Sequence, residues 1–174
     1  MKRIILTTVI AFFALTTTHA QGVDFGIKLG ANFSTLSDAA GAKNKTGFHG
    51  GVFLGLKFNE KLALQPELLY SQQGAKLDIG DVDLNYVNIP VVVKYYLVKG
   101  LNLQVGPQFG FVVDDNFVIG EPENFDLSGV AGLGLDIPLG IRIDARYNFG
   151  LTEIAKNSDS KNGVFSIALG YSFL

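Results

Sequence analysis

Apolar and polar residues alternate with a period of two along most of the chain after residue 22. Between Val23 and Ser34, six apolar positions alternate with six positions that are polar or glycine. This period places successive side chains on opposite faces and is typical of a β strand with one buried face. The alternation predicts eight strands and no helix, at residues 23–34, 48–58, 62–73, 87–97, 101–111, 125–137, 141–151 and 165–173.

The connections between these strands alternate in length. Short turns are predicted at residues 59–61, 98–100 and 138–140, and long polar loops at residues 35–46, 74–83, 112–124 and 152–163. An even number of antiparallel strands with short turns at one end and long loops at the other is the plan of an outer-membrane barrel, whose short turns face the periplasm. The sequence therefore predicts an all-β fold, an eight-stranded antiparallel up-and-down transmembrane β-barrel.

Alternation alone also fits a secreted soluble barrel or sandwich, with the apolar face inward. Two features favour the membrane alternative. The apolar face carries no Asp, Glu, Lys or Arg, while the opposite face carries charges among Gly, Asn, Gln, Ser and Ala. The apolar face also has aromatic residues near both ends: Phe33, Phe48, Tyr70, Phe109, Phe111, Phe125, Tyr147, Phe149 and Phe165 toward the long loops, and Phe25, Phe58, Tyr95, Tyr171 and Phe173 toward the short turns. Two aromatic girdles around an aliphatic belt match two membrane interfaces.

The first residues have the order of a secretory signal peptide. Lys2 and Arg3 precede an apolar run of 12 residues from Ile4 to Leu15, and small residues lead to Ala20. This run is shorter than the roughly 20 residues of a membrane-spanning helix. We expect a cleavable signal peptide over residues 1–20 and an outer-membrane β-barrel domain over residues 21–174, located in the cell outer membrane.

Composition narrows the chemistry. The chain has 174 residues, no cysteine, 17% charged residues and a formal net charge of -2, with 14 Lys and Arg scattered along it. The absence of cysteine excludes disulfide scaffolds, iron-sulfur sites and cysteine zinc sites. The low and scattered basic content argues against nucleic acid as a partner.

Several short motifs resemble those of the small outer-membrane β-barrel family of Bacteroidota, of the porin or PorT type. The matching stretches are residues 25–34, 65–71 with Gly74, 88–90, 94–96, 106–108, 147–152 and 170–173. The resemblance covers nearly the whole predicted mature chain. It implies an outer-membrane barrel but no particular activity. The expected partners are outer-membrane lipids and lipopolysaccharide, the general barrel-insertion machinery and an unknown surface ligand, for a chain that is expected to be a monomer.

Charged residues on the polar face form the most informative set of candidate site residues. An eight-stranded barrel has an interior just wide enough for its side chains, so charges there must be paired. We predict a structural lumen charge network of Lys28, Glu67, Lys94, Arg142, Asp144 and Arg146. Glu67 and Lys94 lie on neighbouring strands and could form a cross-strand ion pair. A proton or ion path along these charges is the alternative to a closed lumen.

Other candidate chemistry is weak. His49 is the only histidine after residue 20, and an enzyme acting on lipid or ester could be built from it with Asp126 and Ser128, although no spacing supports this. Residues 81–85 imitate the start of a calcium loop but lack its glycine and its bidentate Glu, and Gly132 to Gly134 are not followed by a helix as a nucleotide site requires. We therefore predict no catalytic, metal or cofactor residues and no cofactor. The first hypothesis is a non-enzymatic structural or surface-interaction protein acting through four extracellular loops. The alternatives are a narrow pore, or transport- or secretion-associated barrel, and a barrel enzyme.

Overall fold

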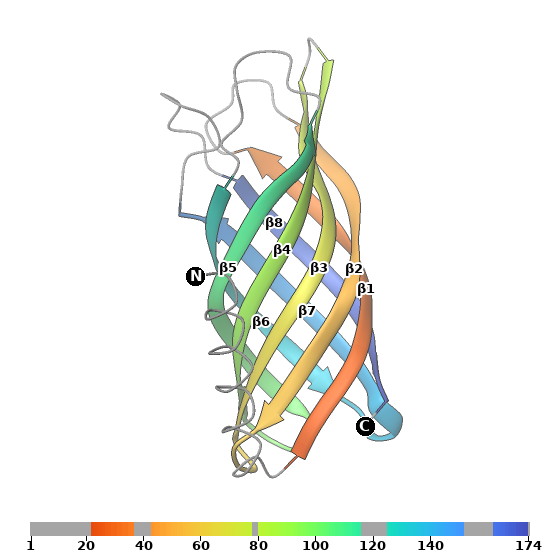
Figure 1. The fold of residues 1–174 in the computed structure, drawn as a ribbon, viewed down its shortest axis with the longest axis vertical. Coiled ribbons are helices and arrows are strands. Elements are labelled where there is room, and N and C mark those ends of the chain that lie inside the picture. The colour runs from red at the N-terminus through yellow and green to blue at the C-terminus, as the bar shows by residue number, and fades with distance from the viewer. Residues whose placement is uncertain (1–21, 37–42, 78–79, 116–124, 152–161, 174) are drawn as a thin grey trace, which may run out of the picture.

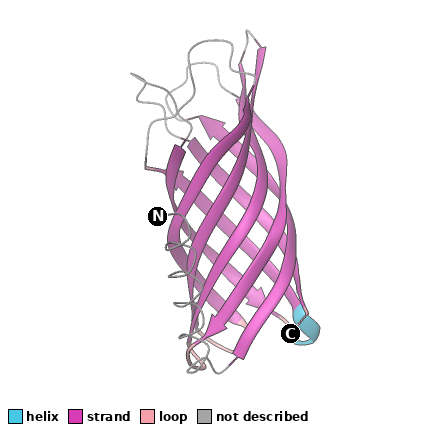
Figure 2. Ribbon diagram, in the orientation of Figure 1, coloured by secondary structure: helices cyan, strands magenta, loops and turns pink. Residues whose placement is uncertain are grey.

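A computed structural model describes residues 22–36, 43–77, 80–115, 125–151 and 162–173. These residues form a single closed barrel, shown in Figures 1 and 2. Its strands are β1 (Gly22–Leu36), β2 (Lys43–Lys57), β3 (Leu62–Leu77), β4 (Gly80–Tyr96), β5 (Leu101–Asp115), β6 (Phe125–Asp136), β7 (Ile141–Gly150) and β8 (Asn162–Ser172). The predicted eight-stranded up-and-down barrel is confirmed.

Every strand pairs antiparallel with its neighbours in sequence, and the barrel closes where β1 pairs with β8. At this seam Leu29 lies opposite Leu169, and the amide of Phe173 donates to the carbonyl of Phe25 over 2.8 Å. Closure leaves no strand edge along the middle of the barrel, which is why the backbone polar groups of such a fold can be satisfied in lipid.

The two faces of each strand differ as the alternation predicts. On β1, the Lys28 side chain points inward and its residue is 1% exposed, whereas the next residue, Leu29, is 67% exposed. On β6 and β7, Leu133 and Ile143 are exposed while Asp144 is buried. The apolar residues therefore cover the outside of the barrel and the charged residues lie inside it.

Aromatic residues of neighbouring strands meet at both ends of the outer face. Near the long connections, Phe33 contacts Phe165 with ring centroids 6.3 Å apart, and Phe111 contacts Phe125 at 5.6 Å. Near the short turns, Phe173 contacts Phe25 at 6.1 Å and Tyr171 at 5.4 Å. Three of these contacts arise because the register places the rings opposite one another on neighbouring strands, whereas Tyr171 and Phe173 are two residues apart on the same face of one segment.

The short turns are confirmed, but three details of the predicted connections are wrong. Residues 74–77 and 80–83 continue the β3–β4 ladder, with Gly74 opposite Asp83 and Leu77 opposite Gly80, instead of forming a long loop. Strands also reach into the other predicted loops, so that β5 ends only at Asp115. The last short turn contains a 3₁₀ helix, η1 (Pro138–Gly140), where no helix was expected. Residues 37–42, 116–124 and 152–161, on which the rest of the predicted loops fall, lie outside the described residues.

Candidate functional site: the charged lumen

The middle of the lumen holds four charged side chains, with Glu67 among them. Alternation on β1, β3 and β7 turns Lys28, Glu67, Asp144 and Arg146 inward, and all four are buried. The Glu67 carboxylate accepts from Lys28 Nζ at 2.8 Å and from Arg146 Nη1 and Nη2 at 2.9 and 2.7 Å. Asp144 Oδ2 lies 2.6 Å from Lys28 Nζ and 3.6 Å from Arg146 Nη2. Two acids and two bases thus form one compact cluster, which we call the central cluster.

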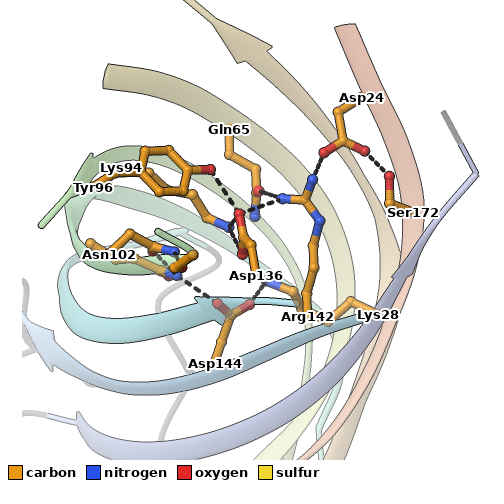
Figure 3. Close-up of polar contacts among 12 residues, drawn as sticks. Asp24, Lys28, Gln65, Lys94, Tyr96, Asn102, Asp136, Arg142, Asp144 and Ser172 are labelled. Atoms are coloured by element: carbon orange, nitrogen blue, oxygen red, sulfur yellow. Dashed lines mark hydrogen bonds and ion pairs between the residues drawn. The ribbon is translucent and has the colours of Figure 1, made fainter. Parts of the chain in front are cut away.

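A second group of charges lies toward the short turns, and Figure 3 shows its members. Asp136, at the end of β6, accepts from Lys94 Nζ at 3.1 Å, from the Tyr96 hydroxyl at 2.7 Å and from Arg142 Nη1 at 3.3 Å. Arg142 also pairs with Asp24 of β1, whose carboxylate accepts a hydrogen bond from the Ser172 hydroxyl of β8. We call Asp24, Lys94, Asp136 and Arg142, with Tyr96 and Ser172, the turn-end cluster.

Two amide side chains extend the network, Gln65 between the two clusters and Gln104 within the central cluster. Gln65 donates to Glu67 Oε1 over 2.6 Å and accepts from Arg142 Nη1 over 3.2 Å. Gln104 accepts from Arg146 Nε over 2.6 Å and donates to Asp144 Oδ1 over 2.5 Å. Since a neutral amide can donate and accept at once, each glutamine satisfies an acid and a base without adding charge.

One glycine and one phenylalanine shape the space for these contacts. A Cβ at Gly134 would collide with the side chains of Gln104 and Asp144, so the approach of these two groups requires glycine there. The Phe53 ring, 1% exposed, lies with its centroid 4.8 Å from Arg142 Cζ and 5.9 Å from Lys28 Nζ. Its face therefore covers both cations with a cation–π contact.

The charges of the two clusters balance. Lys28, Lys94, Arg142 and Arg146 are matched by Asp24, Glu67, Asp136 and Asp144, and every one of the four bases lies in an ion pair. Burying a charge in a low-dielectric interior is costly unless it is paired and hydrogen-bonded. The arrangement meets that condition and fills the cross-section of the barrel with mutually fixed side chains.

The predicted set of six lumen residues lies in these clusters, but one predicted pairing is wrong. Lys94 does not contact Glu67, because Lys94 lies opposite Ala63 in the β3–β4 register, four residues before Glu67. At about 3.3 Å per residue this offset is about 13 Å along the strand. Lys94 pairs with Asp136 instead, and Glu67 pairs with Lys28 and Arg146.

The predicted set also missed members of the network. Asp24, Asp136, Tyr96, Gln65 and Gln104 belong to it, and all five have the inward parity of their strands. That parity was the available signal. It could not show that β1, β6 and β7 bring Asp24, Asp136 and Arg142 together at one end.

His49 lies beyond the central cluster, toward the long connections, in a neutral hydrogen-bonded group. Its Nδ1 lies 2.8 Å from Asn32 Oδ1. The Asn32 amide nitrogen donates to the carbonyl of Gln72, so its oxygen faces the ring and His49 Nδ1 is the donor. Ser128 donates to Asp126 over 2.8 Å, and neither residue contacts His49. The three residues of the enzyme hypothesis are therefore not brought together.

Metal chemistry also has no support in the part of the chain that the structure describes, where no group of three or more His, Cys, Asp and Glu side chains could hold a metal ion. Among those residues, no helix is long and apolar enough to cross a membrane.

Comparison with known proteins decides the family. Residues 18–156 match the family described as "Outer membrane protein beta-barrel domain". The chain belongs to this family. The exposed apolar belt of this outer-membrane barrel thus faces lipid, and its charged lumen crosses the membrane. No curated protein matches the chain.

Solved structures agree with the fold of this outer-membrane barrel. Ail, the attachment invasion locus protein of Yersinia pestis, solved in complex with the heparin analogue sucrose octasulfate, is 20% identical with a TM-score of 0.56, covering 88% of this chain and 100% of Ail. Neisserial surface protein A is 15% identical with a TM-score of 0.63, covering 88% of this chain and 100% of that protein. At these identities the likeness concerns the fold.

Proposed function

We propose that this outer-membrane barrel is a non-enzymatic surface protein, whose lumen is closed and whose interactions are made by the connections at the end opposite the short turns. The observation that carries this proposal is the balanced ion-pair network across the lumen, in which Glu67 alone accepts from Lys28, Gln65 and Arg146. An ion entering such a lumen would have to break buried ion pairs. Each buried charge that loses its partner costs several kcal/mol.

The space beyond the central cluster supports a closed lumen. A cavity of about 20 Å³ lies among His49, Asn148, Gln108 and their neighbours, and Asn148 Oδ1 is buried without a hydrogen-bond partner among the described residues. A cavity of this size has room for one water molecule. A buried water that donates to Asn148 Oδ1 fits this site, whereas a solute does not.

The surface role rests on the architecture and on the class of similar proteins. Because rigid strands position their connections, a barrel with a closed lumen can present variable segments to partners without any chemistry of its own. Ail, the attachment invasion locus protein, and Neisserial surface protein A are named as an attachment protein and a surface protein. We extend to this chain only that broad class of role, together with the expected contacts with outer-membrane lipids and lipopolysaccharide.

Planar-bilayer recording tests the closed lumen. The purified barrel, reconstituted alone, should give no stable open-channel current, while a general porin recorded under the same conditions gives one. Stable conductance by this chain would overturn the closed-lumen proposal and favour the narrow pore.

We further propose that residues 1–20 are an export signal and that the mature barrel domain spans residues 21–174. The motifs at residues 25–34, 65–71 and 147–152 also support the Bacteroidota porin-type subgroup, for which we propose insertion as a monomer by the general barrel machinery. Amino-terminal sequencing of the protein purified from outer membranes should begin at Gln21. A chain that still begins at Met1 in that fraction would contradict the export signal.

A further inference from the structure

The short-turn end of the barrel opens into a vestibule of about 1130 Å³. Its floor is formed by five members of the turn-end cluster, which Figure 3 shows converging inside the strands: Asp24, Tyr96, Asp136, Arg142 and Ser172. Its rim is made by the β2–β3 turn, the β4–β5 turn and η1. The vestibule is therefore closed on the lumen side and open at the rim.

Three lysines lie on the β2–β3 and β4–β5 turns of this rim. Lys57 ends β2, Lys61 precedes β3, and Lys99 lies in the β4–β5 turn. The two turns are adjacent, because the amide of Tyr96 donates to the carbonyl of Lys61 over 2.8 Å. Lys57 Nζ lies 5.7 Å from the centroid of the Tyr96 ring, which holds this ammonium group at the mouth. The remaining part of the rim, Pro138–Gly140, carries no charge and adjoins the β4–β5 turn, because the amide of Asp136 donates to the carbonyl of Gly100 over 2.9 Å.

These lysines differ from the cations of the lumen in having no acidic partner. Lys57, Lys61 and Lys99 are exposed and form no ion pair within the described residues, whereas each base of the two clusters is paired. Asp24 and Asp136, the acids of the floor, are already neutralised by Arg142 and Lys94. Three lysines against Glu60 alone leave the rim with two net positive charges.

We propose that the vestibule is a binding site for a phosphate group. Ammonium groups are compact point charges that bind phosphate oxygens through charge-assisted hydrogen bonds, and three of them can share the several oxygens of one phosphate. The closed floor supplies no further free charge, so the rim lysines determine the affinity and the sign of the ligand. The Tyr96 ring and the uncharged η1 segment leave room for the organic part of a phosphate ester.

The position of the site relative to the membrane allows two sources of the phosphate group. Phe58 and Tyr95, which belong to the aromatic girdle at this end, lie next to Lys57 and to the Leu62 end of β3. Aromatic girdles mark the boundary between hydrocarbon and headgroups, so the lysines lie at the level of lipid phosphates and beside water. The ligand is thus either a soluble phosphate ester or the headgroup of an anionic phospholipid in that leaflet.

The test uses the full folded chain in nanodiscs and separates these sources. In phosphatidylcholine discs, sn-glycerol 3-phosphate is titrated by calorimetry. In a second arm, discs containing phosphatidylglycerol are extracted into detergent, and the lipid retained by the barrel is counted by native mass spectrometry. Each Lys→Gln substitution at positions 57, 61 and 99 should weaken binding about 5-fold, the equivalent of about 1 kcal/mol for a charge pair at 4 Å in water. Glu60→Gln, in the same turn as Lys61, is the matched control. It removes the negative charge of the rim and should therefore strengthen binding.

Saturable binding of glycerol phosphate that the three lysine substitutions together abolish would support the soluble source. Retention of phosphatidylglycerol that the same variant abolishes, without glycerol phosphate binding, would support the lipid source. The proposal is overturned if the wild-type chain binds in neither arm, or if binding survives in the triple variant. Because the lysines lie outside the ion-pair network, these outcomes do not depend on whether the lumen conducts.

Discussion

Replacing Glu67 with Gln should destabilise the barrel more than any other single charge removal in the lumen. Glu67 is 3% exposed and accepts four hydrogen bonds, one from Lys28, one from Gln65 and two from Arg146. In the variant, Asp144 is the one negative charge left in the central cluster for two buried cations, and its contact with Arg146 is already long at 3.6 Å.

The magnitude follows from the buried position of these groups. Removing one partner of a buried ion pair costs about 3 to 5 kcal/mol, because the other charge is left without compensation. The glutamine retains one oxygen that can accept from Arg146 or Lys28, so we expect the lower end of this range, about 3 kcal/mol. Glu60→Gln, at an exposed turn position, is the matched control and should cost less than about 0.5 kcal/mol.

A double-mutant cycle separates the ion pair from general packing. Arg146→Met alone should also be costly, but the variant carrying both Glu67→Gln and Arg146→Met should lose less than the sum, with a coupling of about 2 kcal/mol. The free energy of unfolding is measured by urea titration of the barrel in lipid vesicles. Unheated samples are run on a gel, on which folded and unfolded barrel migrate differently. Additive costs within about 0.5 kcal/mol, or a Glu67 variant as stable as the control, would refute the proposed role of the network.

Four further outcomes can be checked by the same gel assay or by turnover. Val91→Arg should cost about 2 to 4 kcal/mol because a guanidinium would face the apolar belt, and an unchanged unfolding curve would contradict the assigned lipid face. Lys94→Met should cost less than Glu67→Gln, since Asp136 keeps its other two donors; an equal or larger loss would contradict this ranking. Leu139→Asn should stabilise the barrel by about 0.5 to 1 kcal/mol, since Leu139 has a φ of 77° that asparagine adopts more readily, with Leu139→Ala, which should show no gain, as control. His49→Gln should leave lipid and ester hydrolysis at background, and any turnover that this change abolishes would restore the enzyme hypothesis.

Strand order and sidedness could be read from the sequence because they depend on local spacing. The alternation at Lys28 and Leu29 requires one to point inward and the other outward whatever the partner strands are. The aromatic girdles could also be predicted from the sequence, because they follow from the distance of each ring to the nearest turn.

Lumen partners could not be read in the same way, because they depend on the stagger of the strands around the barrel. Glu67 and Arg146 are 79 residues apart in sequence, and only the closed register brings them together. Neighbouring strands suggested Glu67 and Lys94, yet the register separates them by four residues. The extension of the β3–β4 ladder could not be predicted from the sequence for another reason. Its glycines and aspartates are typical of turns, but a hairpin that pairs with itself can continue a ladder through them.

The seam between β1 and β8 has a consequence for circular permutation of the chain. The seam brings Phe25 and Phe173 together, and Asp24 contacts both Arg142 and Ser172 there. A circular permutant that joins residue 173 to residue 22 by a short linker, and is opened between β4 and β5, would keep every ladder of the barrel. The Asp24–Ser172 contact, 148 residues apart in the natural order, would become local. Such a permutant should close its seam early and the β4–β5 ladder last, so the order of assembly would change while the final barrel would not.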